Sequence, residues 1–152
     1  MSKRGGSFLI EESAAQDIFT PEDFSEEQTM IRDMTEQFVD EEVLPRIEQI
    51  EHKEWDVTVK LLRRCGELGL LGIEAPERYG GENLDKVSAM IVAEKMARVG
   101  SFAVSYGGQS GIGMLPLVYF GNESQKRAYL PLLCTAEKIS AYALSESGSG
   151  SD

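Results

Sequence analysis

The sequence is poor in the residues and patterns that mark several common classes of protein. Its 152 residues include two cysteines and one histidine, too few for a disulfide framework or a histidine-rich metal site. The basic start at residues 1–4 is followed by only three consecutive apolar residues, whereas a secretory signal needs roughly 7–15 and a membrane helix about 20. We therefore expect a cytoplasmic protein without a membrane span, with both thiols buried as small apolar side chains.

Positive charge is also scarce. Lysine and arginine number 15 against 26 aspartates and glutamates, which gives a formal net charge of −11. Because nucleic-acid binding depends on a basic surface that neutralises phosphates, this imbalance excludes that function. The acids within residues 23–42 would also suit a metal site or paired catalytic carboxylates, but we interpret them as the solvated face of a helix, with His52 at the surface as well.

Apolar residues recur at steps of three and four along most of the chain, which is typical of amphipathic helices. Capping residues predict that the first helix begins at Thr20 or Ser25, and Pro45 ends its pattern. Further helices are expected at residues 45–52, 56–68 (capped by Asp56), 84–98, 101–120 and 125–133, with Gly69 and Gly100 ending two of them. Its many glycines make the 101–120 helix a buried or broken one.

The fold class predicted from these helices is all-α, a bundle of about six helices. The apolar stripes predict a core that includes Met30, Met34, Phe38, Val87, Met90, Ile91 and Met96. Residues 1–18 have no sustained period and are expected to form a flexible arm before the helical domain at residues 19–138. The short apolar run at residues 139–144 changes the rhythm and predicts a first strand at the start of a different unit, residues 139–152.

The serine- and glycine-rich segment at residues 145–152 is open to two interpretations. Glycines allow backbone N–H groups to turn toward an anion, and serine hydroxyls add donors, so the segment could hold a pyrophosphate. Serine and glycine are also the usual composition of a flexible linker. From the residues alone the function remains that of an acidic helical interaction module with a possible anion loop.

Three segments together resemble signatures of the acyl-CoA dehydrogenase family. Residues 68–81 (LGLLGIEAPERYGG) are similar to its first helical-domain signature, and residues 120–133 (FGNESQKRAYLPLL) resemble its FG-x-x-x-QK-x-x-YLP-x-L segment. Residues 141–152 (AYALSESGSGSD) resemble its flavin-contact signature, A-[YF]-x-[LV]-T-E-P-x-A-G-S-D. The three follow in the family's order and separation, and the resemblance covers residues 24–152.

Three positions depart from the flavin-contact signature. Ser145 replaces threonine but keeps its hydroxyl, Ser147 replaces a proline that fixes the backbone, and Ser149 replaces an alanine. Serine at position 149, and the sequence around Gln109, resemble the long-chain and very-long-chain branch of the family.

The resemblance implies the N-terminal helical domain of an FAD-dependent enzyme of fatty-acid β-oxidation, followed by the first strand of its middle β-domain. In that family an acyl-CoA thioester is oxidised between its α and β carbons, and electrons pass to electron-transfer flavoprotein or a similar acceptor. The residues that would contact FAD are Tyr142, Ala143, Leu144, Ser145, Gly150 and Ser151, and Ser151 would also contact the substrate. Helices between residues 84 and 120 would wall the acyl chain.

The resemblance also implies what this stretch does not contain. The family's catalytic glutamate lies in its C-terminal domain, so no acid here is assigned as the base, and we expect these residues alone to be inactive. The full-length relatives are homo-oligomers. A non-catalytic helical module with the same fold, and a relative that oxidises a different thioester or a nitroalkane, are the alternatives.

Overall fold

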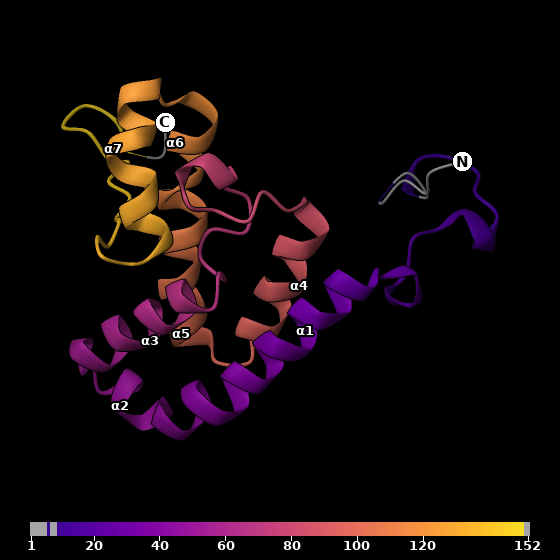
Figure 1. The fold of residues 1–152 in the computed structure, drawn as a ribbon, viewed down its shortest axis with the longest axis horizontal. Coiled ribbons are helices and arrows are strands. Elements are labelled where there is room, and N and C mark those ends of the chain that lie inside the picture. The colour runs from indigo at the N-terminus through magenta and orange to yellow at the C-terminus, as the bar shows by residue number, and fades with distance from the viewer. Residues whose placement is uncertain (1–5, 7–8, 151–152) are drawn as a thin grey trace.

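The computed structural model describes residue 6 and residues 9–150, and every regular element in that part of the chain is helical. The α-helices (Figure 1) are α1 Glu26–Phe38, α2 Ile47–Glu51, α3 Trp55–Glu67, α4 Lys86–Met96, α5 Gly100–Gly107, α6 Leu115–Phe120 and α7 Glu123–Cys134. The all-α prediction is confirmed. One more helix is present than predicted because a π-helical turn, Gly108–Gly113, divides the expected helix at residues 101–120 into α5 and α6.

Side-chain caps begin the helices at both ends of the domain. The Gln28 amide donates to the Ser25 hydroxyl at 3.1 Å and the Ser25 amide donates to the Gln28 side chain at 3.1 Å, so Ser25 rather than Thr20 caps α1. Asn122 and Gln125 form the same reciprocal pair, at 2.9 Å each, at the start of α7. These caps satisfy amide groups that a helix start otherwise leaves without a partner.

Two predicted helix boundaries are wrong. α3 begins at Trp55, before the predicted cap Asp56, and Gly100 is the first residue of α5 instead of the end of α4. α4 ends at Met96, and Val99, with φ −124° and ψ 89°, leaves the helical path before the chain turns into α5. The predicted end at Gly69 is confirmed, with a left-handed φ of 73° that glycine adopts without strain.

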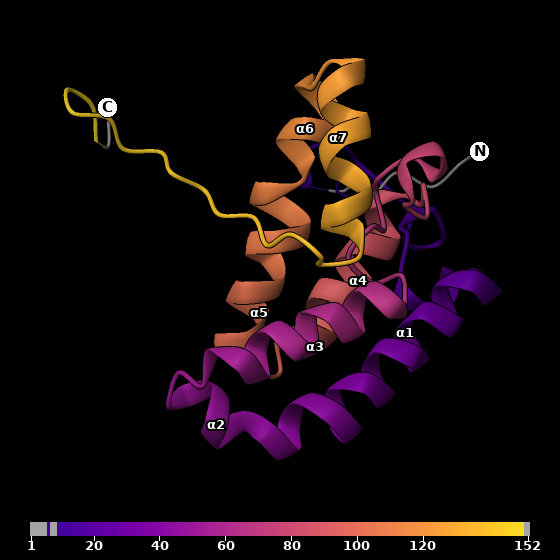
Figure 2. The ribbon, with the colours of Figure 1, turned by 60° about the vertical axis from the view of Figure 1, so that its left-hand side comes forward.

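The helices pack in two groups. α1 lies against α4, while α3 and α4 both contact α5, and α6 contacts α7. In Figure 2, α5, α6 and α7 rise from a layer that contains α1 and α3. The core between the groups includes side chains with no exposed surface: Val43, Cys65, Leu70, Val92, Met96, Phe102 and Leu130. Burial of each large side chain contributes roughly 1.5–3 kcal/mol to folding.

Two methionines predicted in the core lie at the surface instead. Met30 is 71% exposed and Met90 is 70% exposed. α4 buries Ser88, Ile91 and Val92, and Met90 lies roughly 200° around the helix from Ser88, since each residue turns the helix by about 100°. The prediction that these two methionines face the core is therefore wrong.

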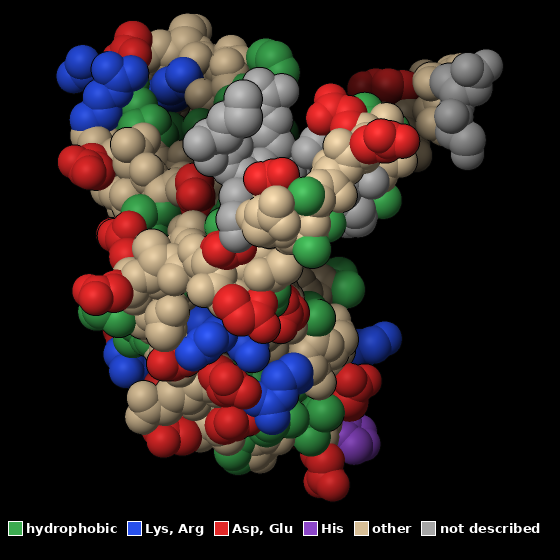
Figure 3. Space-filling view, turned by 90° about the vertical axis from the view of Figure 1, so that its right-hand side faces the viewer, with side chains coloured by type: hydrophobic (Ala, Val, Ile, Leu, Met, Phe, Trp, Pro, Cys, Tyr) green, Lys and Arg blue, Asp and Glu red, His purple; other side chains and the backbone are tan. Residues whose placement is uncertain are grey.

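Charged side chains of both signs cover the face formed by α1 and α4, where Figure 3 shows acidic and basic groups interspersed. Arg98 pairs with Asp40 at 2.6 Å, and Lys95 lies 3.4 Å from Glu36. All four side chains keep contact with water, so the acids on the first helix form a solvated, partly paired surface, as predicted.

The loop between α3 and α4 folds back on itself as a compact unit. The amides of Glu82, Asn83 and Leu84 donate to the carbonyls of Gly72, Ala75 and Ile73 at 2.7–2.9 Å. Gly81 permits this approach, since a Cβ there would lie 2.1 Å from the Ala75 carbonyl oxygen.

Gly81→Ala is therefore expected to lower the free energy of unfolding by about 2–3 kcal/mol, because the added methyl group overpacks rigid backbone. Urea denaturation followed by circular dichroism measures the effect. Gly100→Ala is the matched control, since its Cβ meets nothing within 4 Å. Equal stability of the two variants would contradict the close packing of this loop.

Candidate functional site

The segment predicted to bind a cofactor leaves the helical body as an exposed extension (Figure 2). Residues 141–150 are exposed throughout, and two backbone hydrogen bonds, of 2.8 and 3.2 Å, close a turn between Glu146 and Ser149. The predicted cofactor residues on this arm are Tyr142, Ala143, Leu144, Ser145 and Gly150. The sixth, Ser151, lies outside the described residues.

The strand predicted at residues 139–144 is not formed. A β-strand needs a neighbouring strand to pair with its N–H and C=O groups, and the described part of the chain contains no second strand. The strand prediction is therefore wrong. The apolar pattern of one segment does not show whether a second segment is present to pair with it. Ile139, Tyr142 and Leu144 are about half exposed or more as a result, at 48%, 54% and 64%.

The arm carries the donors that a flavin dinucleotide requires. The Ser145 and Ser147 side chains are exposed, and no atom lies within 4 Å of the position a Cβ would take at Gly148 or Gly150. Hydroxyl groups and glycine amides of this kind bind phosphate and ring oxygens. The residues present thus fit the cofactor in chemistry, and they form one side of a site, because the helical body encloses none of them.

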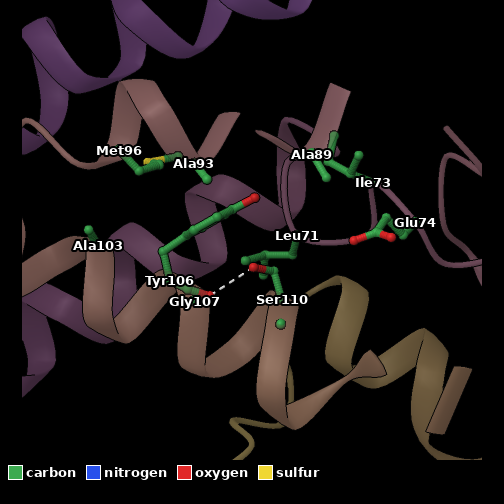
Figure 4. Close-up of a pocket in the computed structure, with 11 residues that line it drawn as sticks. Leu71, Ile73, Glu74, Ala89, Ala93, Met96, Ala103, Tyr106, Gly107 and Ser110 are labelled. Carbon is green, nitrogen blue, oxygen red and sulfur yellow. Dashed lines mark hydrogen bonds between the residues drawn. The ribbon is translucent and has the colours of Figure 1, made fainter. Parts of the chain in front are cut away.

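An apolar pocket of about 210 Å³ lies between α4, the α5 segment and the loop after Leu70 (Figure 4). Small side chains leave this space open: Ala89, Ala93, Ala103, Gly107 and Gly111. Tyr106 lies along one wall, and its hydroxyl donates to the Leu70 carbonyl at 2.8 Å. Burial raises the pKa of this phenol well above its usual value, so the group stays protonated and acts as a fixed donor.

Glu74 is the carboxylate in the lining of this pocket. It pairs with Lys86 and accepts a hydrogen bond from the Tyr119 hydroxyl at 3.2 Å. Because the carboxylate is already engaged by a cation and a phenol, it is not available as a free base at the pocket wall. The hydrogen bond to Glu74 raises the pKa of Lys86, which keeps the ammonium group charged.

The opposite side of the same helical segment presents a second apolar surface. Val104 is 77% exposed and Ile112 is 56% exposed. Gly108 lies between them at a spacing of four residues from each, and a Cβ there would meet nothing within 4 Å. This outer surface of residues 104–112 is therefore apolar and exposed, with open space over Gly108.

A third apolar surface lies between α1 and the loop that precedes α4. Its pocket of about 280 Å³ is lined by Met30, Met34 and Leu84, with Glu27 and Glu82 among the lining residues. Methionine side chains adapt to different partners, which makes exposed methionine-lined pockets typical of protein-binding surfaces.

Gln109 is the polar residue that sequence reasoning did not single out as functional. It is 1% exposed and lies in the π-helical turn between α5 and α6. Its carboxamide makes hydrogen bonds to the segment from which the exposed arm departs. A lone glutamine among glycines and apolar residues was the signal available in the sequence.

Neither thiol is arranged for nucleophilic chemistry. Cys65 and Cys134 are both buried, as predicted, and burial raises the pKa of both thiols, that of Cys134 to about 11. His52 is exposed, with Nδ1 2.7 Å from the Glu48 carbonyl oxygen. Within residues 9–150 no three His, Cys, Asp or Glu side chains come together as a metal-binding group.

Comparisons with known proteins identify the helical body. Residues 25–137 match the family model described as acyl-CoA dehydrogenase, N-terminal domain. The chain belongs to the acyl-CoA dehydrogenase family. A probable acyl-CoA dehydrogenase of Bacillus subtilis is 52% identical over 99% of this chain, and isovaleryl-CoA dehydrogenase of Pongo abelii is 36% identical over 100% of this chain and 35% of its own length. The family is thus established, while the long-chain and very-long-chain branch stays a prediction.

A solved structure agrees with the family in fold. The crystal structure of an acyl-CoA dehydrogenase from Bacillus anthracis, complexed with FAD, matches 97% of this chain at 57% identity with a TM-score of 0.89. This chain covers 25% of that acyl-CoA dehydrogenase and 25% of the Bacillus subtilis relative. Among the described residues of this family member, no helix combines the length and hydropathy that crossing a membrane requires.

The buried thiols give a pH dependence that tests the packing of this acyl-CoA dehydrogenase domain. The pKa of Cys134 is about 11 in the folded chain, raised from an unfolded value near 9.0. A raised folded pKa contributes stability that is complete below pH 9 and is lost as the pH rises toward 11. We expect slow alkylation of both cysteines at pH 8 without denaturant and rapid alkylation in 6–8 M urea, roughly the range that unfolds domains. Fast native alkylation would contradict their burial.

Proposed function

We propose that this chain supplies the N-terminal helical domain of an FAD-dependent acyl-CoA dehydrogenase acting in cytoplasmic fatty-acid β-oxidation. The observation that carries the proposal is the 57% identity and TM-score of 0.89 with an acyl-CoA dehydrogenase complexed with FAD. We propose the same division as the sequence predicted: an arm at residues 1–18, the helical domain at 19–138, and the start of a middle β-domain at 139–152.

The exposed arm of residues 141–150, not the N-terminal arm, is the part of this chain that would hold the cofactor. FAD, when bound, supplies the acceptor for the hydride that leaves the β-carbon of the thioester. The Ser145 hydroxyl would donate near the isoalloxazine N5, the Leu144 backbone would lie at the polar edge of the ring, and Ser151 would lie near the pyrophosphate and the thioester. The exposure of Tyr142, Ala143 and Gly150 leaves all of them free to pack against a cofactor.

We assign the base that removes the α-proton to none of the acids of this chain. The acids that line the apolar pockets are ion-paired or solvated. Glu74 pairs with Lys86, and Glu82 lies at the exposed pocket lined by Met30 and Met34. A base needs a free carboxylate held within hydrogen-bond reach of the α-carbon's proton. The helical domain would therefore bind and orient the cofactor and the acyl chain, and the base would belong to the rest of the enzyme.

The acyl chain would lie along the outer surface of residues 104–112. This surface combines two exposed aliphatic side chains, Val104 and Ile112, with the open floor at Gly108. Each methylene transferred from water to such a surface contributes about 0.8 kcal/mol when it is fully buried. The arm that would carry the flavin is hydrogen-bonded at Ser140 to Gln109 of the same segment, so cofactor and acyl chain would meet beside the π-helical turn.

Electrons would leave through electron-transfer flavoprotein or a similar acceptor, and the enzyme would be a homo-oligomer. The pocket lined by Met30 and Met34, between α1 and the loop that precedes α4, is the surface of this domain that suits such an acceptor. An apolar side chain can enter it, while Glu27 and Glu82 attract basic neighbours. Support for this partner comes also from a structural neighbour of 30% identity in a structure of the electron transferring flavoprotein of Acidaminococcus fermentans.

A chimera tests the proposed function. This chain replaces the matching quarter of the Bacillus anthracis enzyme. The chimera is expected to purify yellow, with flavin absorbance bands, and to oxidise acyl-CoA with a dye as acceptor, because both sides of the flavin site are then present. The 152 residues alone are expected to be colourless and inactive. A folded but colourless and inactive chimera would favour the alternative, a helical interaction module without chemistry.

Substitutions at two glycines in the chimera test the place of the acyl chain. Gly108→Leu places a bulky side chain on the outer surface of residues 104–112 and is expected to lower kcat/KM for a long-chain acyl-CoA at least tenfold more than for butanoyl-CoA, since about two or more methylenes lose their contact. Gly111→Leu, which fills the pocket of Figure 4 and likewise meets nothing within 4 Å, is the control. The opposite ranking would move the acyl chain to that pocket.

A further inference from the structure

The segment that leads into the exposed arm is held by one buried side chain. The Gln109 Nε2 group donates to the Leu133 carbonyl at 2.8 Å and to the Lys138 carbonyl at 3.0 Å. Its Oε1 accepts from the Ser140 amide at 2.7 Å and from the Ser140 hydroxyl at 2.9 Å. A carboxamide has two N–H donors and two acceptor lone pairs, so its full capacity is used on residues 133–140.

The arrangement works in one orientation of the amide only. If Nε2 and Oε1 were exchanged, two donors would face the Ser140 amide and an acceptor would face two carbonyl oxygens. The same argument separates glutamine from glutamate, since a carboxylate cannot donate to Leu133 or Lys138. The pattern therefore requires the amide specifically, not merely a polar side chain of this length.

The π-helical turn that carries Gln109 also provides the seat for Ser140. A Cβ on Gly113 would lie 2.0 Å from the Ser140 Oγ, so only glycine allows this close approach. The Ser140 hydroxyl also lies 3.4 Å from the Gly108 carbonyl oxygen. Gly108 also lies on the outer apolar surface of residues 104–112, so one turn both holds the root of the arm and contributes to that surface.

The position of this contact has a consequence for the residues beyond it. In an extended chain, alternate side chains point to opposite faces, and a slip by one residue exchanges the faces. Ser140 is two residues before Tyr142 and five before Ser145, a reach of only about 7 to 17 Å. Holding Ser140 therefore determines which side chains of the arm face a ligand beside the turn.

We propose that Gln109 is a positioning residue. Its carboxamide clamps Ser140 and so determines which side chains of residues 141–150 face the flavin and the outer surface of residues 104–112. The proposal rests on the proposed function for the identity of that ligand. The clamp itself is a property of this chain and is tested without any ligand.

Hydrogen exchange and limited trypsin digestion of the 152-residue chain measure the clamp. The Ser140 amide is expected to exchange at least tenfold more slowly than the amides of residues 141–145, and trypsin to cut slowly after Lys138, whose carbonyl the clamp holds. In Gln109→Glu both rates should rise roughly tenfold or more, since two buried hydrogen bonds are lost. Thr35→Val is the control, because it removes another buried hydrogen bond, 2.7 Å to the Ile31 carbonyl, in α1.

The chimera then connects the clamp to the cofactor. There Gln109→Glu is expected to raise the dissociation constant for FAD at least tenfold. Thr35→Val is expected to leave that constant unchanged, and the melting temperatures of both variants are measured to compare their loss of stability. Fast exchange at Ser140 in the unsubstituted chain, or equal effects of the two variants on FAD, would overturn the proposal. A chimera that holds no flavin with Gln109 intact refutes the proposed function instead, and the exchange rates still decide the clamp.

Discussion

The rest of the structure depends on the segment Gly100–Phe120 being buried along one side and open along the other. On its inner side, Phe102 and Met114 are almost completely buried and the Tyr106 hydroxyl holds the Leu70 carbonyl. These contacts join α5 to α3, α4 and the folded loop. On its outer side, Gly108 and two exposed aliphatic side chains, Val104 and Ile112, form an apolar surface. A π-helical turn accommodates both demands because it widens the helix locally, a device that is frequent at functional sites.

Under the proposed function, this division of labour would let a rigid helical body serve redox chemistry while the catalytic acid lies elsewhere in the enzyme. The body supplies an apolar wall and a fixed point of departure for an arm rich in hydrogen-bond donors. The chemistry of electron transfer belongs to the flavin, and the protein's contribution is to place its partners within reach. In the proposed reaction, hydride transfer to the flavin requires the ring and the thioester to be held in close register. The buried hydrogen bonds of Gln109 would therefore contribute to positioning as well as to stability.

Local signals in the sequence predicted much of this fold. The capping box at Ser25 and the left-handed Gly69 are decided by neighbours a few residues away, so they can be read directly. The directions of Met30 and Met90, and the absence of pairing in residues 139–144, depend on distant partners that periodicity does not contain. Gln109 was missed for the same reason, because its four hydrogen bonds reach residues 24–31 positions away. The flavin residues were proposed from resemblance, and the exposure of the five that the structure describes, Tyr142, Ala143, Leu144, Ser145 and Gly150, is compatible with that role.

A crystal structure of the chimera with FAD is the most direct measurement of the account. It is expected to show residues 26–138 as they are here, Ser140 still bonded to Gln109, and residues 142–151 in contact with the flavin, with the Ser145 hydroxyl within hydrogen-bond distance of the ring. A bound flavin that residues 142–151 do not touch, or a Ser140 detached from Gln109 while the flavin is held, would contradict it.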